Sequence, residues 1–189
     1  MRKIFIALVV FVIAFGMVGQ VQAGNPIRVY YAGEQDNVYG ALKLAPDGTF
    51  AFVTDPAQAD VFVLNGQTPG IEKISSQVAA GAGVVLIPGL QTDAATVEKI
   101  TGVPVEVSSR ENPVSLTEIK ISDPLVTEII WNGAPQVRER LEMVTPLSSV
   151  QPLVTAYEDG SWVLWQARPK VLVFNAFLSN GANPQIQEW

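Results

Sequence analysis

The alternation of apolar and polar residues is most regular in residues 59–89. Two uninterrupted apolar runs of strand length, 61–64 and 84–87, are separated by about twenty residues. Between them, three apolar residues recur at the spacing of one helix face: Ile71, Ile74 and Val78. Strands without polar alternation are typical of a parallel sheet that is covered on both faces. The stretch therefore predicts a parallel strand–helix–strand unit.

Strand and helix signals also alternate before this unit. The runs 27–31 and 50–53 are rich in β-branched and aromatic residues, and each predicts a strand. Residues 36–44 predict a short helix. Its inward face is expected to carry Val38, Leu42 and Leu44. Asp55 followed by Pro56 predicts an N-cap and the first residue of a single helical turn.

The same rhythm continues after residue 89. Thr92 or Asp93 is expected to cap a helix that runs to Thr101, and Gly102 is expected to end it. Residues 103–107 then predict a fifth strand. Five units of this kind predict an α/β fold with a doubly wound, mostly parallel sheet.

The last third of the chain has an antiparallel pattern. Residues 153–157 and 161–167 predict two strands joined by a turn at Glu158-Asp159-Gly160. A second turn at residues 168–170 leads to a final strand, Val171–Phe174. We therefore expect a C-terminal antiparallel hairpin beside the parallel sheet.

The amino terminus has the pattern of an export signal. Arg2 and Lys3 precede an apolar run, and Val21-Gln22-Ala23 resembles a cleavage site. This predicts a signal peptide at 1–23, a single α/β domain at 24–189, and a secreted or periplasmic location. The alternative is an uncleaved membrane anchor formed by residues 4–21. The chain has no cysteine, which excludes lipid attachment through a cysteine and a disulfide framework.

Charge and composition exclude several classes of function. Removal of residues 1–23 leaves 10 basic against 18 acidic residues, a net charge of −8. Such a surface repels phosphate backbones and anionic lipids, so no nucleic-acid partner is expected. No glycine-rich phosphate loop occurs, so no nucleotide and no other cofactor are expected. With no histidine and no cysteine, a metal site is disfavoured, although scattered carboxylates leave a low-affinity Ca²⁺ site open.

The order of these segments resembles the class I glutamine amidotransferase-like superfamily, in particular its uncharacterised bacterial members. The resemblance covers residues 26–183 and rests on a flavodoxin-like half, Asp123-Pro124-Leu125, the Glu158-Asp159-Gly160 turn and the final strand. It implies a nucleophilic cysteine after the strand at 84–87, a histidine after a late strand and an acidic residue beside it. Here the first turn reads Pro88-Gly89-Leu90-Gln91, and neither reagent of the triad is present, so we expect no enzyme activity.

Several residues remain candidates for binding. The resemblance places an oxyanion-hole loop at Asn65-Gly66-Gln67. Trp162 and Trp165 are three apart on one strand, so we expect opposite faces, with one in the core and the other packed at an edge or exposed to a partner. Asn183-Pro184 predicts a short C-terminal helix that either docks Ile186 and Trp189 or is a shortened version of a longer helix. The candidate ligand or partner contacts are Glu34, Asp36, Asn65, Gly66, Gln67, Gly89, Gln91, Asp93, Trp162 and Trp189.

Two functions follow as expectations. The first is an exported, catalytically inactive glutamine amidotransferase-like domain that serves as a binding or structural subunit of a membrane-associated complex, with a protein partner. The alternative is a hydrolase of saccharide or envelope material that uses carboxylates after the predicted strands. Its candidates are Glu34, Asp36, Asp55 and Asp93, which are otherwise explained as helix caps and loop residues.

Overall fold

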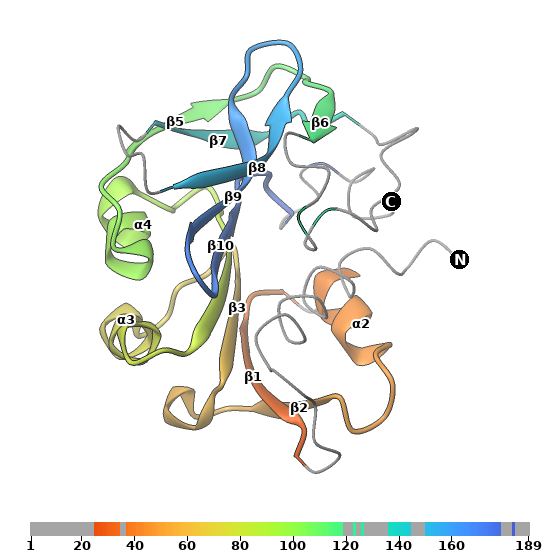
Figure 1. Cartoon of the computed structure of the whole chain (residues 1–189), viewed down its shortest axis with the longest axis vertical. Helices are drawn as coiled ribbons and strands as arrows, with labels where there is room; N and C mark the ends of the chain where they lie inside the picture. The colour runs from red at the N-terminus through yellow and green to blue at the C-terminus, as the bar shows by residue number, and fades with distance from the viewer. Residues whose placement is uncertain are drawn as a thin grey trace.

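The computed structural model describes residues 25–34, 37–118, 123, 126, 136–144, 150–178 and 183. Its centre is a mixed sheet of eight strands with helices on both faces (Figure 1). In sheet order the strands are β2 (Phe50–Val53), β1 (Ile27–Ala32), β3 (Val61–Asn65), β4 (Gly83–Ile87), β10 (Val171–Phe174), β9 (Trp162–Arg168), β8 (Gln151–Ala156) and β6 (Leu116–Glu118).

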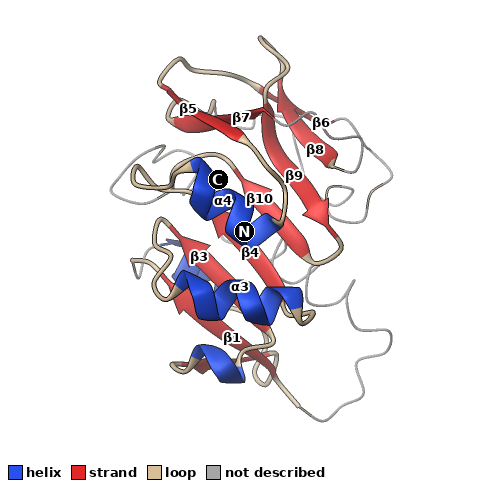
Figure 2. Ribbon diagram, turned by 90° about the vertical axis from the view of Figure 1, so that its left-hand side faces the viewer, coloured by secondary structure: helices blue, strands red, loops and turns tan. Residues whose placement is uncertain are grey.

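The predicted strand–helix–strand unit is confirmed at the centre of the parallel half. Strands β3 and β4 pair in parallel, every residue of both is buried, and α3 (Ile71–Ala79) connects them. Helix α3 buries Ile74 and Val78 against one face of the sheet, beside α4 (Ala94–Thr101) (Figure 2). Helix α2 (Asn37–Lys43) covers the opposite face with Val38 and Leu42. The sheet is therefore doubly wound, as the apolar pattern predicts.

The predicted helix boundaries are also confirmed, with one exception. Asp55 caps the short 3₁₀ helix η1 (Pro56–Gln58), Asp93 caps α4, and Gly102 ends α4 in the left-handed conformation with φ 72°. Leu44, expected to face inward, is instead 62% exposed. Helix α2 ends at Lys43, so Leu44 lies in the following turn and has left the apolar stripe.

The predicted fifth strand of the parallel sheet is wrong. Strand β5 (Glu106–Arg110) pairs antiparallel with β7 (Arg140–Val144) in a separate two-stranded sheet. The place beside β4 is taken by β10, which comes much later in the chain and runs parallel to β4. The difference follows from burial: β10 is almost wholly apolar and buried, whereas four of the five β5 residues are exposed.

The antiparallel hairpin is confirmed, but the expected orientation of its tryptophans is not. Strands β8, β9 and β10 pair antiparallel in succession. Trp165 is fully buried and Trp162 is half-buried, and their ring centroids are 5.9 Å apart within one core cluster. The register between β8 and β9 shifts near Val154, which breaks the strict alternation of faces.

Several predictions fall outside the described residues. They include the signal peptide or anchor, most of the helix after Asp123, and the C-terminal segment with Ile186 and Trp189. Asn183 is described, but its Oδ1 accepts from the backbone N–H groups of Arg138 and Glu139, and its φ is 48°. The N-cap role expected for Asn183 is therefore wrong, because its acceptor is already used. Within the described part of the chain, no helix is long and apolar enough to cross a membrane.

Candidate functional site

The carboxyl ends of the parallel strands meet at one edge of the sheet, where their exit turns pack backbone against backbone. A Cβ atom on Gly33, after β1, would overlap the carbonyl oxygen of Asn65 and lie 2.9 Å from its Cβ. A Cβ on Gly89, after β4, would lie 2.8 Å from both the Cα and the carbonyl oxygen of Gly66. Glycine is required at both positions because real side chains do not approach backbone this closely.

Hydrogen bonds fasten the same turns to one another. The fully buried Asn65 donates from Nδ2 to the Tyr31 hydroxyl (3.1 Å), which in turn donates to the carbonyl of Glu34 (2.8 Å). The Gly66 N–H donates to the carbonyl of Ile87 (2.8 Å). The Gly89 N–H donates to Oγ1 of Thr92 (2.9 Å). The turns after β1, β3 and β4 are thus closely packed at this edge. We call the residues Gly33, Asn65, Gly66 and Gly89 the floor of the candidate site.

The structure brings most of the predicted site residues to this edge. Asn65 and Gly89 are buried in the floor and Gly66 is half-buried, whereas Glu34, Gln67, Gln91 and Asp93 are exposed around it. Leu90, which was not among the candidates, is 67% exposed in the same turn. Asp36 and Trp189 lie outside the described residues.

Two of the candidate carboxylates have structural roles. Asp93 accepts a hydrogen bond from the backbone N–H of Thr96 (2.8 Å), and this contact keeps the pKa of Asp93 below its ordinary value. Asp55 accepts from Lys73 (2.8 Å) and from the N–H of Ala57, which lower its pKa in the same way. The interpretation of these two residues as helix caps is confirmed. Among the described residues, no group of three acidic side chains is placed to hold a metal ion.

Protonation of such carboxylates should control stability against acid. A carboxyl group whose pKa is lower in the folded than in the unfolded state stabilises the fold above its unfolded pKa, and that contribution is lost as the pH falls through the folded pKa. We expect the free energy of unfolding to be flat between about pH 6 and 8, because the chain has no histidine, and to fall below about pH 4. In the described part of the chain, the carboxyl groups with lowered pKa are Asp55, Asp60, Asp93, Glu158 and Asp159. Urea unfolding at a series of pH values measures this, and a maximum within pH 6–8 would contradict it.

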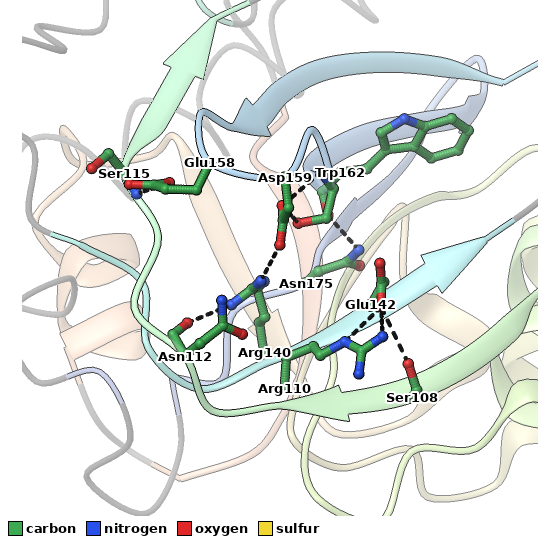
Figure 3. Close-up of polar contacts among 11 residues, drawn as sticks. Ser108, Arg110, Asn112, Ser115, Arg140, Glu142, Glu158, Asp159, Trp162 and Asn175 are labelled. Carbon is green, nitrogen blue, oxygen red and sulfur yellow. Dashed lines mark hydrogen bonds and ion pairs between the residues drawn. The ribbon is translucent and has the colours of Figure 1, made fainter.

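Asn175, directly after β10, is a site residue that the sequence analysis missed. It is fully buried, and its Oδ1 accepts from the indole N–H of Trp165 (3.1 Å). Its Nδ2 donates to the carbonyl of Trp162 (2.8 Å) (Figure 3). Strand β10 lies beside β4, so Asn175 occupies the strand exit next to the Gly89 turn. The sequence shows that Asn175 directly follows the last apolar run, and this position could have marked it as a strand-exit residue. The local pattern does not show that β10 lies beside β4.

A buried arginine lies near Asn175 and was also missed. Arg140 is fully buried; it donates from Nη1 to the carbonyl of Asn112 (2.7 Å) and from Nη2 to Asp159 (2.9 Å) (Figure 3). Asp159 also accepts from the N–H (2.9 Å) and the hydroxyl (2.6 Å) of Ser161. Partial burial pushes the pKa of Asp159 upward, but these hydrogen bonds and the charge of Arg140 outweigh it and keep the pKa low. The Glu158-Asp159-Gly160 turn is therefore anchored to β7.

A cavity of about 880 Å³ opens at the opposite edge, where the parallel strands begin. Arg28 and Asp60 line the cavity and form an ion pair through two contacts. Nη2 of Arg28 lies 2.7 Å from Oδ1 of Asp60, and Nε of Arg28 lies 3.0 Å from Oδ2. The Arg28 guanidinium keeps the pKa of Asp60 low. Lys170 is a further cation in the lining. Ligands in open α/β sheets bind beyond the carboxyl ends of the strands, so the Gly33–Gly66–Gly89 edge remains the candidate site.

Comparison with known proteins agrees on the fold. The solved structure of SMU.1228c has 15% sequence identity, covers 80% of this chain and 76% of its own, and gives a TM-score of 0.52. A protein from Thermoplasma acidophilum that is described as a GMP synthase subunit has 14% identity, covers 87% of each chain, and gives a TM-score of 0.50. No protein-family model and no curated protein matches the sequence. The chain thus has the α/β fold with a doubly wound, mostly parallel sheet that its residue pattern predicts, and this flavodoxin-like fold is similar to that of the two solved structures.

Proposed function

We propose that the chain is an exported, catalytically inactive glutamine amidotransferase-like domain that acts as a binding or structural subunit of a membrane-associated complex. The observation that carries the proposal is the turn after β4. Relatives with activity would hold a nucleophile there, and here Gly89 is pressed against the backbone of Gly66.

The conformation of this turn supports the loss of catalysis. A nucleophile elbow is a sharp, strained turn that lifts one side chain above the sheet. No residue between Pro88 and Gln91 has a positive φ, and position 89 has no room for a Cβ atom. The side chain of a cysteine placed at position 89 would therefore collide with the backbone of Gly66.

The exit of β10 supports the same proposal. The resemblance implies a histidine after a late strand, and the residue that follows β10 is Asn175. A carboxamide does not take up a proton near neutral pH, so it cannot serve as the general base. Both ends of this carboxamide are already used by Trp162 and Trp165. Asn175 therefore fits a structural role at the strand exit.

The carboxylate alternative finds less support. A general acid of a glycosidase needs a raised pKa, because it must carry a proton near neutral pH. Asp55 and Asp93 have lowered pKa values and are engaged in caps. We therefore retain the binding role as the proposal.

The exposed part of the edge suits recognition of a protein. Leu90 stands 67% exposed, with the exposed side chains of Gln67 and Gln91 in the same strand exits. Carboxamides both donate and accept hydrogen bonds, and a rigid floor reduces the ordering cost of binding. An exposed leucine among carboxamides therefore offers an apolar contact with polar surroundings.

Replacing Leu90 by aspartate should remove the partner without unfolding the protein. We expect a protein that co-purifies with the chain from membranes in mild detergent to be reduced at least about tenfold in the Leu90→Asp variant. The matched control is Leu44→Asp, which changes a leucine of similar exposure (62%) in the turn after α2. Recovery of the chain without any other protein, or equal loss in both variants, would contradict the proposal.

The absence of glutaminase chemistry is a separate prediction. The purified chain, incubated with glutamine, should release no more ammonia than a buffer blank. Because the chain has neither the histidine nor the cysteine that the resemblance implies, the Asn175→Ala variant should give the same result. Ammonia release above the blank that Asn175→Ala abolishes would overturn the inactive assignment.

A further inference from the structure

Strand β5 is the outer strand of the small two-stranded sheet. One of its sides pairs with β7, in the register Glu106↔Val144 to Arg110↔Arg140. The far side of β7 is bridged to Ala176, after β10. No described strand pairs with the outer side of β5, and both Figure 1 and Figure 2 place this strand at the periphery. An open strand edge is a template for pairing with another chain.

The hydrogen bonds of β7 show which β5 groups face outward. The N–H of Leu141 donates to the carbonyl of Asn175 (3.0 Å), so it points away from β5. Ser109, opposite Leu141, is therefore in a non-hydrogen-bonded pair with β7, and its own N–H and C=O point to the open side. By the period of two, the backbone groups of Val107 point the same way.

We propose that β5 pairs with β5 of a second copy of this chain, antiparallel and two-fold symmetric about Ser108. Val107 of each copy then exchanges backbone hydrogen bonds with Ser109 of the other. Glu106 of each copy lies directly opposite Arg110 of the other. The result is a continuous four-stranded sheet in the order β7-β5-β5-β7.

Charge selects this register among the available ones. The outward backbone groups of Val107 and Ser109 can form hydrogen bonds only with outward backbone groups of the second copy. Two-fold axes at Val107 or at Ser109 also meet this condition. Those arrangements place Arg110 opposite Pro104 or Ser108. The axis at Ser108 instead creates two opposite-charge pairs at non-hydrogen-bonded positions, where facing side chains are closest.

The side chain of Arg110 is already positioned for such a pair. Its Nε donates to Glu142 on β7 (2.6 Å), and the side chain remains 50% exposed (Figure 3). A guanidinium has five N–H donors, so it can contact Glu142 on one side and Glu106 of the second copy on the other. Glu142 on β7, Arg110 and Glu106 of the second copy then alternate in charge across three neighbouring strands.

The limits of the strand favour a closed dimer over a fibre. Pro104 and Pro113 bound the segment, and proline cannot extend a ladder of backbone hydrogen bonds. A two-fold contact also uses the same edge of both copies and leaves no second β5 edge for further addition. The net charge of −8 on each mature chain opposes nonspecific association, so the local charge pairs matter most at this edge.

A single cysteine tests the axis directly, because the chain has none of its own. Ser108 residues of the two copies would face each other in a non-hydrogen-bonded pair, at a spacing that a disulfide can bridge. Under mild oxidation Ser108→Cys should give a disulfide-linked dimer. Ser76→Cys, which places a cysteine on the exposed face of α3, should stay monomeric. A Ser108→Cys protein that cross-links no faster than Ser76→Cys would overturn the proposal.

Sedimentation velocity of the processed chain, measured over a concentration series, tests the pairing without cross-links. Ser109→Pro removes an outward N–H and should abolish the dimer, whereas Ser109→Ala should keep it. Glu106→Arg should raise the dissociation constant about tenfold or more, and the double variant Glu106→Arg/Arg110→Glu should restore it. A wild-type monomer, or a dimer indifferent to Ser109→Pro, overturns the proposal. Either result leaves the partner at Leu90 unaffected, so the two proposals fail separately.

Discussion

Replacing Gly33 by alanine is expected to lower the free energy of unfolding by about 3–5 kcal/mol. Gly33 has a φ of 146°, which is unfavourable for any residue with a Cβ, and a Cβ there would overlap the carbonyl oxygen of Asn65. Strand β3 cannot easily shift away from the added methyl group, because all its residues are buried between two layers. Urea unfolding followed by tryptophan fluorescence measures the change.

Gly40→Ala is the matched control for this substitution. Gly40 lies in α2, nothing lies within 4 Å of the place that an added methyl group would take, and its φ is not positive. Alanine in a helix is favoured over glycine, so we expect a gain of about 0.5–1 kcal/mol. If Gly33→Ala were as stable as the parent chain, the close contact between the β1 and β3 exits would be contradicted, and with it the rigid floor of the candidate site.

The contrast between these two glycines shows what local sequence can predict. The periodicity of residues 61–87 reports burial on each side of a single segment, so it identifies β3, α3 and β4 and their parallel arrangement. Caps such as Asp93 are equally local. The contact of Gly33 with Asn65 joins two strand exits that are far apart in the chain, and no periodicity reports it.

The errors have the same origin. The position beside β4 goes to β10 rather than to the next strand along the chain, because an apolar strand gains more from the centre of the sheet than the polar β5 does. Arg140 lies among charged neighbours in the sequence and would be expected at the surface, but the Asn112 carbonyl and Asp159 converge on it from other segments. Trp162 joins Trp165 because a register shift interrupts the alternation on which the prediction depended.

The second large effect on stability is expected at the ion pair between the buried Arg140 and the partly exposed Asp159. Arg140 is 0% exposed and Asp159 is 39% exposed, so removing the carboxylate leaves a buried cation whose remaining described acceptor is the carbonyl of Asn112. We expect Asp159→Asn to cost about 2–4 kcal/mol, because the shape of the side chain is kept while its charge is lost. Ser161→Ala removes only the 2.6 Å hydroxyl contact to Asp159 and should cost about 1 kcal/mol.

The double variant separates the charge from the packing. If the cost of Asp159→Asn comes from the uncompensated guanidinium, then adding Arg140→Met should recover part of it, since methionine fills a similar volume without a charge. The expected coupling between the two substitutions is about 1–3 kcal/mol, measured as a double-mutant cycle in urea. Additive losses would mean that Arg140 and Asp159 act independently. The Glu158-Asp159-Gly160 turn would then be held mainly by its contacts with the segment before β6, such as the Ser115 N–H bond to Glu158 (2.7 Å), and not by β7.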